Sequence, residues 1–232
     1  MPRENPVYFL REKVERGYIH PDQAFQNELR IAQPNHVWVD LGCGTNRFVE
    51  EYSSNFGLAF GIDPESGLKM RAVRPFVLTG AEEYPISSDS IDLATMFMVA
   101  EHLAQPARTM QEVLRILKPG GRFLCCTVHK YFWSCLLNRI LGERIKNAVV
   151  GAVFGQSHED VFPATYQFND STRVESVLTA VGFEEIEINE YVEYYHFNRP
   201  VFRLQHFLHH RTPLGKGPLM KSHLLVSATK PC

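Results

Sequence analysis

Short apolar runs alternate with helical patterns through the first half of the chain. The clearest run, Val37–Leu41, stops at a glycine, which is typical of a strand buried on both faces. Similar runs lie at 58–63, 76–79, 91–98 and 122–128, and helical patterns lie between them at 47–53, 66–73 and 106–117. Strands that alternate with helices predict an α/β fold, a mostly parallel sheet with helices on both faces.

The second half departs from this rhythm. We expect a helix over about 131–154, a loop over 155–163, a helix over 171–181, and strands over 183–192 and 223–229. The histidine-rich stretch 196–220 reads as irregular. These boundaries predict one domain over 35–232, preceded by a helical cap over 1–34. Inserted segments over 129–169 and 196–220 are expected to form a lid over a substrate.

Composition limits the classes of protein that fit. The 232 residues are 44% hydrophobic and carry a formal net charge of -2, which suits one globular domain and argues against a broad grip on duplex nucleic acid. The five cysteines show no CxxC spacing, so neither a disulfide framework nor a zinc site is predicted. Cys125 and Cys126 are expected to point to opposite faces of one strand. Without a signal-peptide profile or an apolar run of roughly 18 residues, the sequence predicts a cytoplasmic protein with no membrane span.

The stretch Val39–Thr45 is the most informative motif. Gly42 and Gly44 follow the first predicted strand, and glycines there let the backbone pass close to a ligand. A dinucleotide fingerprint would place a third glycine at Arg47, so a pyrophosphate-binding turn is disfavoured. Asp40 puts a carboxylate at the carboxyl end of the strand, which suits a ligand that carries an ammonium group.

Asp63 ends the second predicted strand. An acidic residue at this place in a nucleotide-binding sheet accepts both ribose hydroxyls, and we favour that role over a helix N-cap before Pro64. The connection 80–92 is too short for a full helix crossover, so it is expected to lie over the carboxyl edge of the sheet, near an adenine.

Five motifs along residues 35–128 occur in a familiar order. They are Val39–Thr45, Gly61–Asp63, Gly80–Glu82, Ile91–Asp92 and Glu112–Arg122. In this spacing the chain resembles class I S-adenosylmethionine-dependent methyltransferases, most closely the type 11-like branch that acts on small molecules and lipids. The resemblance implies a Rossmann-like, seven-stranded sheet with an antiparallel last strand.

The same resemblance implies S-adenosylmethionine as cofactor. The residues expected around it are Asp40, Gly42, Cys43 and Gly44 for the methionine part, Asp63 for the ribose, Ala81 and Glu82 for the adenine, and Phe97 for the sulfonium. The family usually has glycine where this chain has Asn46. Because asparagine tolerates left-handed backbone, we expect the turn to survive.

A general base is needed only when the methyl acceptor must lose a proton. The candidates are His102, His129 and His158. Each has an alternative: an orienting or packing role for the histidines that follow strands, and an ordinary solvated loop for the third. A further group, His206, His209 and His210, lacks carboxylate or cysteine partners at ligand spacing. We interpret it as the solvated face of a basic helix, and no metal is predicted.

These observations predict an enzyme that transfers a methyl group to a small, hydrophobic or glycosylated metabolite. The alternative is a catalytically inactive binding or regulatory protein with the same fold. A nicotinamide-dependent oxidoreductase is third, because the third glycine is missing. No nucleic-acid partner is expected. The apolar helix that begins near Trp133 favours a lid or buried packing over contact with a membrane surface, which stays an alternative.

Overall fold

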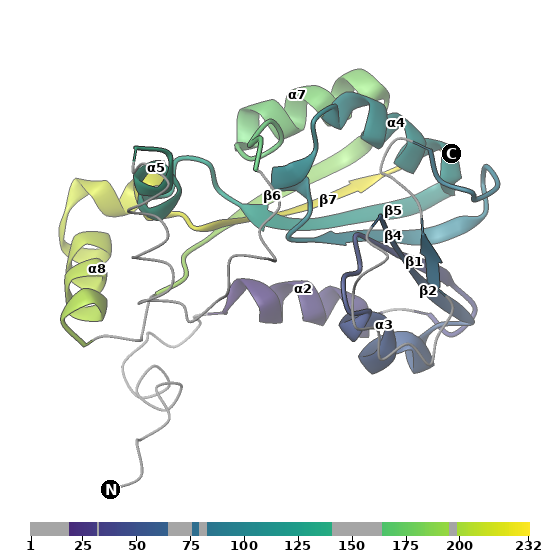
Figure 1. The fold of residues 1–232 in the computed structure, drawn as a ribbon, viewed down its shortest axis with the longest axis horizontal. Helices are drawn as coiled ribbons and strands as arrows, with labels where there is room; N and C mark the ends of the chain where they lie inside the picture. The colour runs from purple at the N-terminus through teal and green to yellow at the C-terminus, as the bar shows by residue number, and fades with distance from the viewer. Residues whose placement is uncertain (1–18, 32, 65–75, 79–82, 141–163, 195–198) are drawn as a thin grey trace, which may run out of the picture.

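The computed structural model describes residues 19–31, 33–64, 76–78, 83–140, 164–194 and 199–232. Its centre is a seven-stranded sheet in the order β3-β2-β1-β4-β5-β7-β6 (Figure 1). The strands are β1 (Val37–Leu41), β2 (Leu58–Asp63), β3 (Phe76–Leu78), β4 (Ile91–Phe97), β5 (Leu117–Val128), β6 (Glu184–Tyr191) and β7 (His223–Thr229). Neighbouring strands are parallel except at β7, which runs antiparallel to both β5 and β6. The predicted Rossmann-like sheet with an antiparallel last strand is therefore confirmed.

Helices cover both faces of this sheet (Figure 1). On one face lie α2 (Pro21–Arg30) and α3 (Arg47–Tyr52), and on the other lie α4 (Pro106–Ile116) and α7 (Ser171–Val181). Helices α5 (Trp133–Ile140) and α8 (Arg199–Arg211) lie at one end of the sheet. One apolar core lies between the sheet and α4 with α7, and includes Val39, Met110 and Val174. A second lies between the sheet and α2 with α3, and includes Phe25 and Trp38. Alternate strand residues supply the two cores, as period-two side-chain placement requires.

The adjacent cysteines of β5 follow this alternation. Cys125 belongs to the core under α4 and α7, and Cys126 to the core under α2 and α3. Burial raises the pKa of both thiols, so both stay protonated and serve as small packing groups. The prediction that they point to opposite faces is confirmed.

Helix ends lie where local sequence signals place them. Helix α7 spans the predicted residues because Asp170 accepts a hydrogen bond from the backbone amide of Arg173 (3.0 Å) at its start. Gly182 ends it with φ +108°, a left-handed conformation that favours glycine. Helix α4 starts at Pro106 and ends at Ile116, where β5 follows at once.

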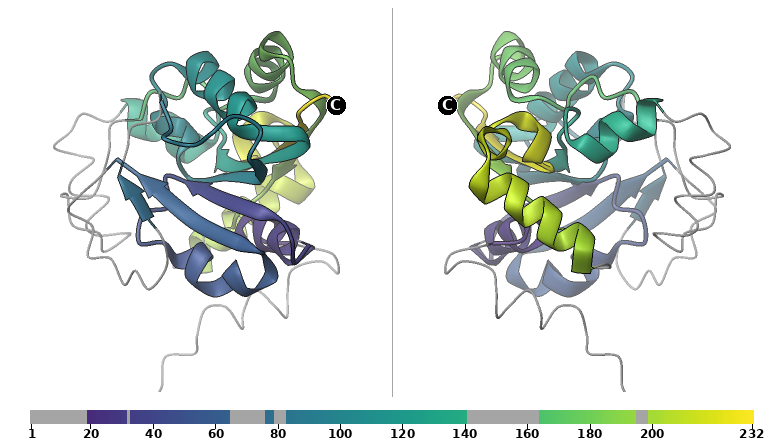
Figure 2. Two further views of the ribbon diagram at one scale, coloured as in Figure 1. Left: turned by 90° about the vertical axis from the view of Figure 1, so that its right-hand side faces the viewer. Right: turned by 90° about the vertical axis from the view of Figure 1, so that its left-hand side faces the viewer.

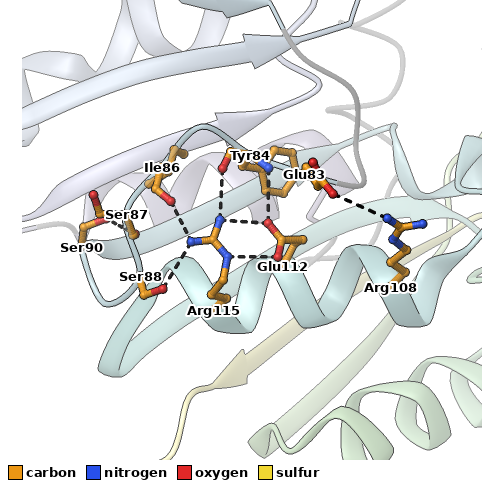
Figure 3. Close-up of polar contacts among 9 residues, drawn as sticks. All are labelled: Glu83, Tyr84, Ile86, Ser87, Ser88, Ser90, Arg108, Glu112 and Arg115. Atoms are coloured by element: carbon orange, nitrogen blue, oxygen red, sulfur yellow. Dashed lines mark hydrogen bonds and ion pairs between the residues drawn. The ribbon is translucent and has the colours of Figure 1, made fainter.

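The connection that leads into β4 is fastened to α4 (Figure 3). The guanidinium of Arg115 donates to the carbonyl oxygens of Ile86 (2.8 Å) and Tyr84 (3.1 Å) and pairs with Glu112 (2.9 Å). Glu112 in turn accepts a hydrogen bond from the amide of Tyr84 (3.3 Å). The ion pair between Arg115 and Glu112 therefore holds residues 84–88 along α4. These contacts fix the path of the connection between the carboxyl edge of the sheet and the start of β4.

Some of the predicted element boundaries differ from the structure, and others extend beyond the described residues. The stretch 196–220, expected to be irregular, contains the 13-residue helix α8 and two short 3-10 turns, so that expectation is wrong. The fifth strand begins at Leu117, because the chain pairs with Ile91 before an irregularity in register. Of the helix expected over 131–154, the structure describes α5 (Trp133–Ile140), and residues 141–154 lie outside the described residues. The same is true of the helix expected over 66–73 and of residues 1–18 of the cap.

Within the described residues, no helix is long and apolar enough to cross a bilayer.

Candidate cofactor-binding site

The loop between β1 and α3 has three residues in left-handed conformation. Gly42 and Gly44 have φ +73° and +53°, and Asn46 has φ +61°. Both Gly42 and Cys43 donate backbone hydrogen bonds to the carbonyl oxygen of Ile62, at 2.7 and 3.0 Å. The loop is thus bound to the end of β2, and the expectation that asparagine preserves the turn is confirmed.

The two glycines of the loop serve different purposes. A Cβ on Gly42 would lie 2.4 Å from a methyl group of Val99, so close packing excludes any side chain there. A Cβ on Gly44 would meet no atom of the described residues within 4 Å. Among those residues, the backbone at Gly44 is therefore uncovered at the carboxyl edge of the sheet, where ligands of open α/β sheets bind.

Asp63 fixes the loop from the end of β2. Its Oδ2 accepts a hydrogen bond from the amide of Gly44 at 2.9 Å, and the side chain is buried. This contact differs from both roles considered for Asp63 from sequence, because it joins β2 to the glycine loop. The carboxylate nonetheless lies at the predicted edge, next to Gly44.

Asp40 is the most unusual group of the site. It is 2% exposed, and its Oδ1 accepts a hydrogen bond from the Thr95 hydroxyl at 2.6 Å. The indole of Trp38 donates to that same hydroxyl oxygen at 2.9 Å. Burial, helped by the charge of Asp63, raises the pKa of Asp40 to about 7 despite the Thr95 hydrogen bond. The carboxyl group is therefore poised to change charge near neutral pH.

Two carboxylates give the loop a negative potential. Burial, followed by the charges of Asp40 and Asp63, raises the pKa of the Cys43 thiol. Cys43 therefore stays protonated and is no nucleophile. A site with this potential stabilises a cationic ligand and disfavours a phosphate.

The remaining residues predicted to bind the cofactor are Phe97, Ala81 and Glu82. Phe97 is half-buried and packs against Phe25 and Phe48, at ring-centroid distances of 5.0 and 4.9 Å. Arg47, next to the loop, lies over the Phe48 ring at 4.5 Å. Ala81 and Glu82 lie outside the described residues.

The structure describes two of the three candidate bases. His102 is half-buried, and its Nε2 lies 3.9 Å from Glu101 Oε1. His129 is buried; its Nδ1 accepts a hydrogen bond from the amide of Tyr131 (3.2 Å), and burial lowers its pKa. The ring of His129 is therefore neutral with its proton on Nε2, a poor arrangement for a base. His158 lies outside the described residues.

A buried polar chain near His102 was not predicted from sequence. The Thr127 hydroxyl donates a hydrogen bond to the Glu101 carboxylate (2.8 Å) and accepts one from the side-chain amide of Asn169 (2.7 Å). Burial raises the pKa of Glu101. These residues lie far apart in the sequence, so no motif indicates that they meet.

The histidines of α8 do not form the solvated face that the sequence suggested. All three are half-buried, and the Tyr194 hydroxyl contacts His209 Nδ1 and, at 2.9 Å, His210 Nε2. The rings of His206 and His210 lie 4.2 Å apart. Among the described residues, no group of three or more histidine, cysteine, aspartate or glutamate side chains is arranged to hold a metal ion.

The strand order with an antiparallel β7 and the glycine loop after β1 are those of the class I S-adenosylmethionine-dependent methyltransferase fold. Residues 39–125 match the family described as "Methyltransferase domain". S-Adenosylmethionine is the cofactor of this class.

Two known proteins are similar to parts of the chain. An uncharacterized methyltransferase of Mycolicibacterium gilvum is 34% identical over 96 residues, 38% of this chain and 37% of that protein. The uncharacterized protein MJ1252 of Methanocaldococcus jannaschii is 27% identical over 154 residues, 64% of this chain and 61% of that protein. The chain thus spans less than two thirds of either relative.

A solved S-adenosylmethionine-dependent methyltransferase from Mesorhizobium loti shares the fold. Its TM-score is 0.59 at 19% identity, covering 90% of this chain and 100% of that one.

Proposed function

We propose that this protein transfers a methyl group from S-adenosylmethionine to a small, hydrophobic or glycosylated acceptor. The observation that carries the proposal is the glycine loop at the carboxyl edge of the sheet. The described residues leave Gly44 uncovered there, the buried carboxylate of Asp63 accepts a hydrogen bond from the Gly44 amide at 2.9 Å, and buried Asp40 lies near the end of β1. The cofactor has an ammonium group, a sulfonium and a ribose diol, all of which suit a carboxylate-lined site without a phosphate-binding turn.

Bound S-adenosylmethionine supplies a methyl carbon that an acceptor lone pair attacks while the carbon–sulfur bond pair returns to sulfur, which leaves S-adenosylhomocysteine. The protein therefore needs to bind and align more than to react. Asp63 would accept the ribose hydroxyls, and the ionised form of Asp40 would stabilise the ammonium. The backbone at Gly42 and Gly44 would let the methionine part approach the sheet edge.

An acceptor hydroxyl would also have to lose a proton. His102 is the described candidate best suited to take it, because its ring is half-buried and follows β4 at the carboxyl edge. We expect His102→Ala to keep cofactor binding and lower turnover only for an acceptor that loses a proton.

The acceptor class rests on the segments outside the shared core. The described parts of the two proposed lid segments, α5 and α8, lie at the end of the sheet where β5 and β6 finish (Figure 1). Acceptor choice is proposed to reside there, because binding residues are often carried by loops and added segments that a rigid core positions.

Calorimetric titration with S-adenosylmethionine and S-adenosylhomocysteine tests the proposal. Asp63→Asn keeps an oxygen for the Gly44 amide and removes the charge, so we expect affinity to fall about ten-fold. Asp92→Asn is the matched control: Asp92 also accepts a backbone hydrogen bond, from Val37 (2.7 Å), but at the start of β4. Its affinity should equal that of the unchanged chain.

The outcomes separate the alternatives. Absence of heat with either ligand would refute the enzyme assignment and favour a regulatory protein. Binding of a nicotinamide cofactor would instead favour an oxidoreductase. When binding is seen, radiolabelled cofactor incubated with fractions of a whole-cell extract should label an organic-soluble or glycosylated fraction, and label in protein or nucleic acid would refute the acceptor class.

A further inference from the structure

The outer face of α8 exposes large apolar side chains between arginines. Leu204 is 59% exposed and Phe207 is 55% exposed. Arg203, Phe207 and Arg211 follow one another at four-residue spacing, so they lie in one row along the helix with Leu204 beside them. Figure 2 (right) shows α8 in the foreground, with this side of the molecule toward the viewer.

The opposite face of α8 is fixed to the domain. Phe202 and Gln205 are buried, and the Gln205 side chain donates to the carbonyl oxygen of Glu193 at 2.7 Å. His209 and His210 contact the hydroxyl of buried Tyr194. Because inward-facing residues hold the helix in one rotation, the outward row is a defined surface of the folded protein.

The segment that contains this surface carries charge of one sign. Residues 194–222 include no aspartate or glutamate, whereas arginine or lysine occurs at 199, 203, 211, 216 and 221. Leu214 and Lys216, just beyond the helix, are also exposed and extend the same composition. Since the whole chain has a net charge of -2, the remainder is acidic and the basic charge is concentrated in this region.

We propose that the outer face of α8 docks on an anionic lipid surface. Leucine and phenylalanine would enter the boundary between headgroups and acyl chains, and the arginines would reach lipid phosphates. The absence of carboxylates in this segment removes the repulsion that an anionic surface would otherwise exert. This proposal stands apart from methyl transfer, because binding to lipid requires neither cofactor nor acceptor.

Sedimentation with lipid vesicles tests the proposal. The full chain is mixed with vesicles of phosphatidylcholine, alone or with phosphatidylglycerol, and the bound fraction is measured. We expect binding to the anionic vesicles only, weakened by salt. Arg203→Gln with Arg211→Gln should lower the partition coefficient about thirty-fold, and Leu204→Ser with Phe207→Ser at least about ten-fold.

A matched control uses exposed apolar residues elsewhere. Ile31 is 71% exposed and Leu58 is 48% exposed, and Leu58 starts β2, which is four strands from β7 in the sheet. Ile31→Ser with Leu58→Ser should leave vesicle binding unchanged. Circular dichroism of each variant confirms that it is folded.

Several results would overturn the proposal. Equal binding to both vesicle types, binding to neither, or equal losses in the control variant would each do so. A second copy of the chain is the competing occupant. If sedimentation velocity shows a dimer that Leu204→Ser with Phe207→Ser converts to monomer, the surface is a subunit interface instead. Because calorimetry with S-adenosylmethionine is a separate measurement, failure of lipid binding leaves the proposed enzyme function unaffected.

Discussion

Replacing Asp40 with asparagine should stabilise the folded protein at high pH. The buried carboxyl has a pKa raised from 3.8 to about 7, so the unfolded chain ionises it more readily than the folded one. At about 1.4 kcal/mol per pH unit across that interval, the ionised group costs the folded state about 4 kcal/mol. Asparagine keeps an oxygen for the Thr95 hydroxyl and never ionises. Allowing for burial of its amide hydrogens, we expect a gain of about 3 kcal/mol.

The sign of the pH dependence identifies the cause. Below about pH 3 Asp40 is protonated in both states of the natural chain, so the advantage of Asp40→Asn is absent there. It should grow as the pH rises from about 4 to about 7 and be constant above 7. Urea unfolding of both proteins at pH 4.5, 6 and 8, at constant ionic strength, measures this difference directly.

Asp92→Asn provides a control of opposite sign. Burial opposes the ionisation of Asp92, but hydrogen bonds from Lys118 (2.7 Å) and the Val37 amide outweigh it and lower the pKa. Its removal should destabilise the protein at pH 7, and the loss should fade as the pH falls through the lowered pKa. Equal stability of Asp40→Asn and the natural chain at pH 8, or a difference independent of pH, would refute the reasoning for Asp40.

Three further changes have defined outcomes. Gly61→Ala should cost about 2 kcal/mol of unfolding free energy, because its Cβ would lie 2.2 Å from Asn46 Oδ1; an unchanged thermal midpoint would contradict this. Asn46→Gly should be neutral or stabilising by up to about 1 kcal/mol, since it keeps the left-handed backbone and removes a buried oxygen that lacks a hydrogen bond; a large loss in urea unfolding would show a hidden partner. Arg115→Gln should lower the melting temperature by about 5 °C by releasing Tyr84 and Ile86, whereas Arg108→Gln, which removes an exposed ion pair, should change it little.

Much of the fold could be predicted from local patterns. The continuous apolar run of β1 and the cap residues of α7 each contain their own signal, because burial on both faces and capping depend on neighbouring residues. The sequence also indicates the left-handed turn at Asn46. The antiparallel last strand was implied by family resemblance and is confirmed by the pairing of β7.

The site contacts that escaped prediction join distant segments. The Thr95 hydroxyl meets Asp40 across β1 and β4, and Asp63 meets the Gly44 amide across β2 and the loop. No spacing rule encodes such pairs. The extent of helix α8 was missed for another reason, although a basic helix was expected at His206–His210: its buried face carries Gln205 and His209, so the apolar periodicity that marks a helix is weak.

The position of β7 governs how the chain can fold as it is synthesised. β7 lies between β5 and β6. The backbone groups along one edge of β5 therefore have no strand to pair with until residues 223–229 have emerged from the ribosome. Some hundred residues separate the two strands, which at cellular synthesis rates is on the order of ten seconds. During that interval the edge at Phe123–Cys126 is open to pairing with other chains. A nascent chain stalled before residue 223 is therefore the form most in need of a chaperone.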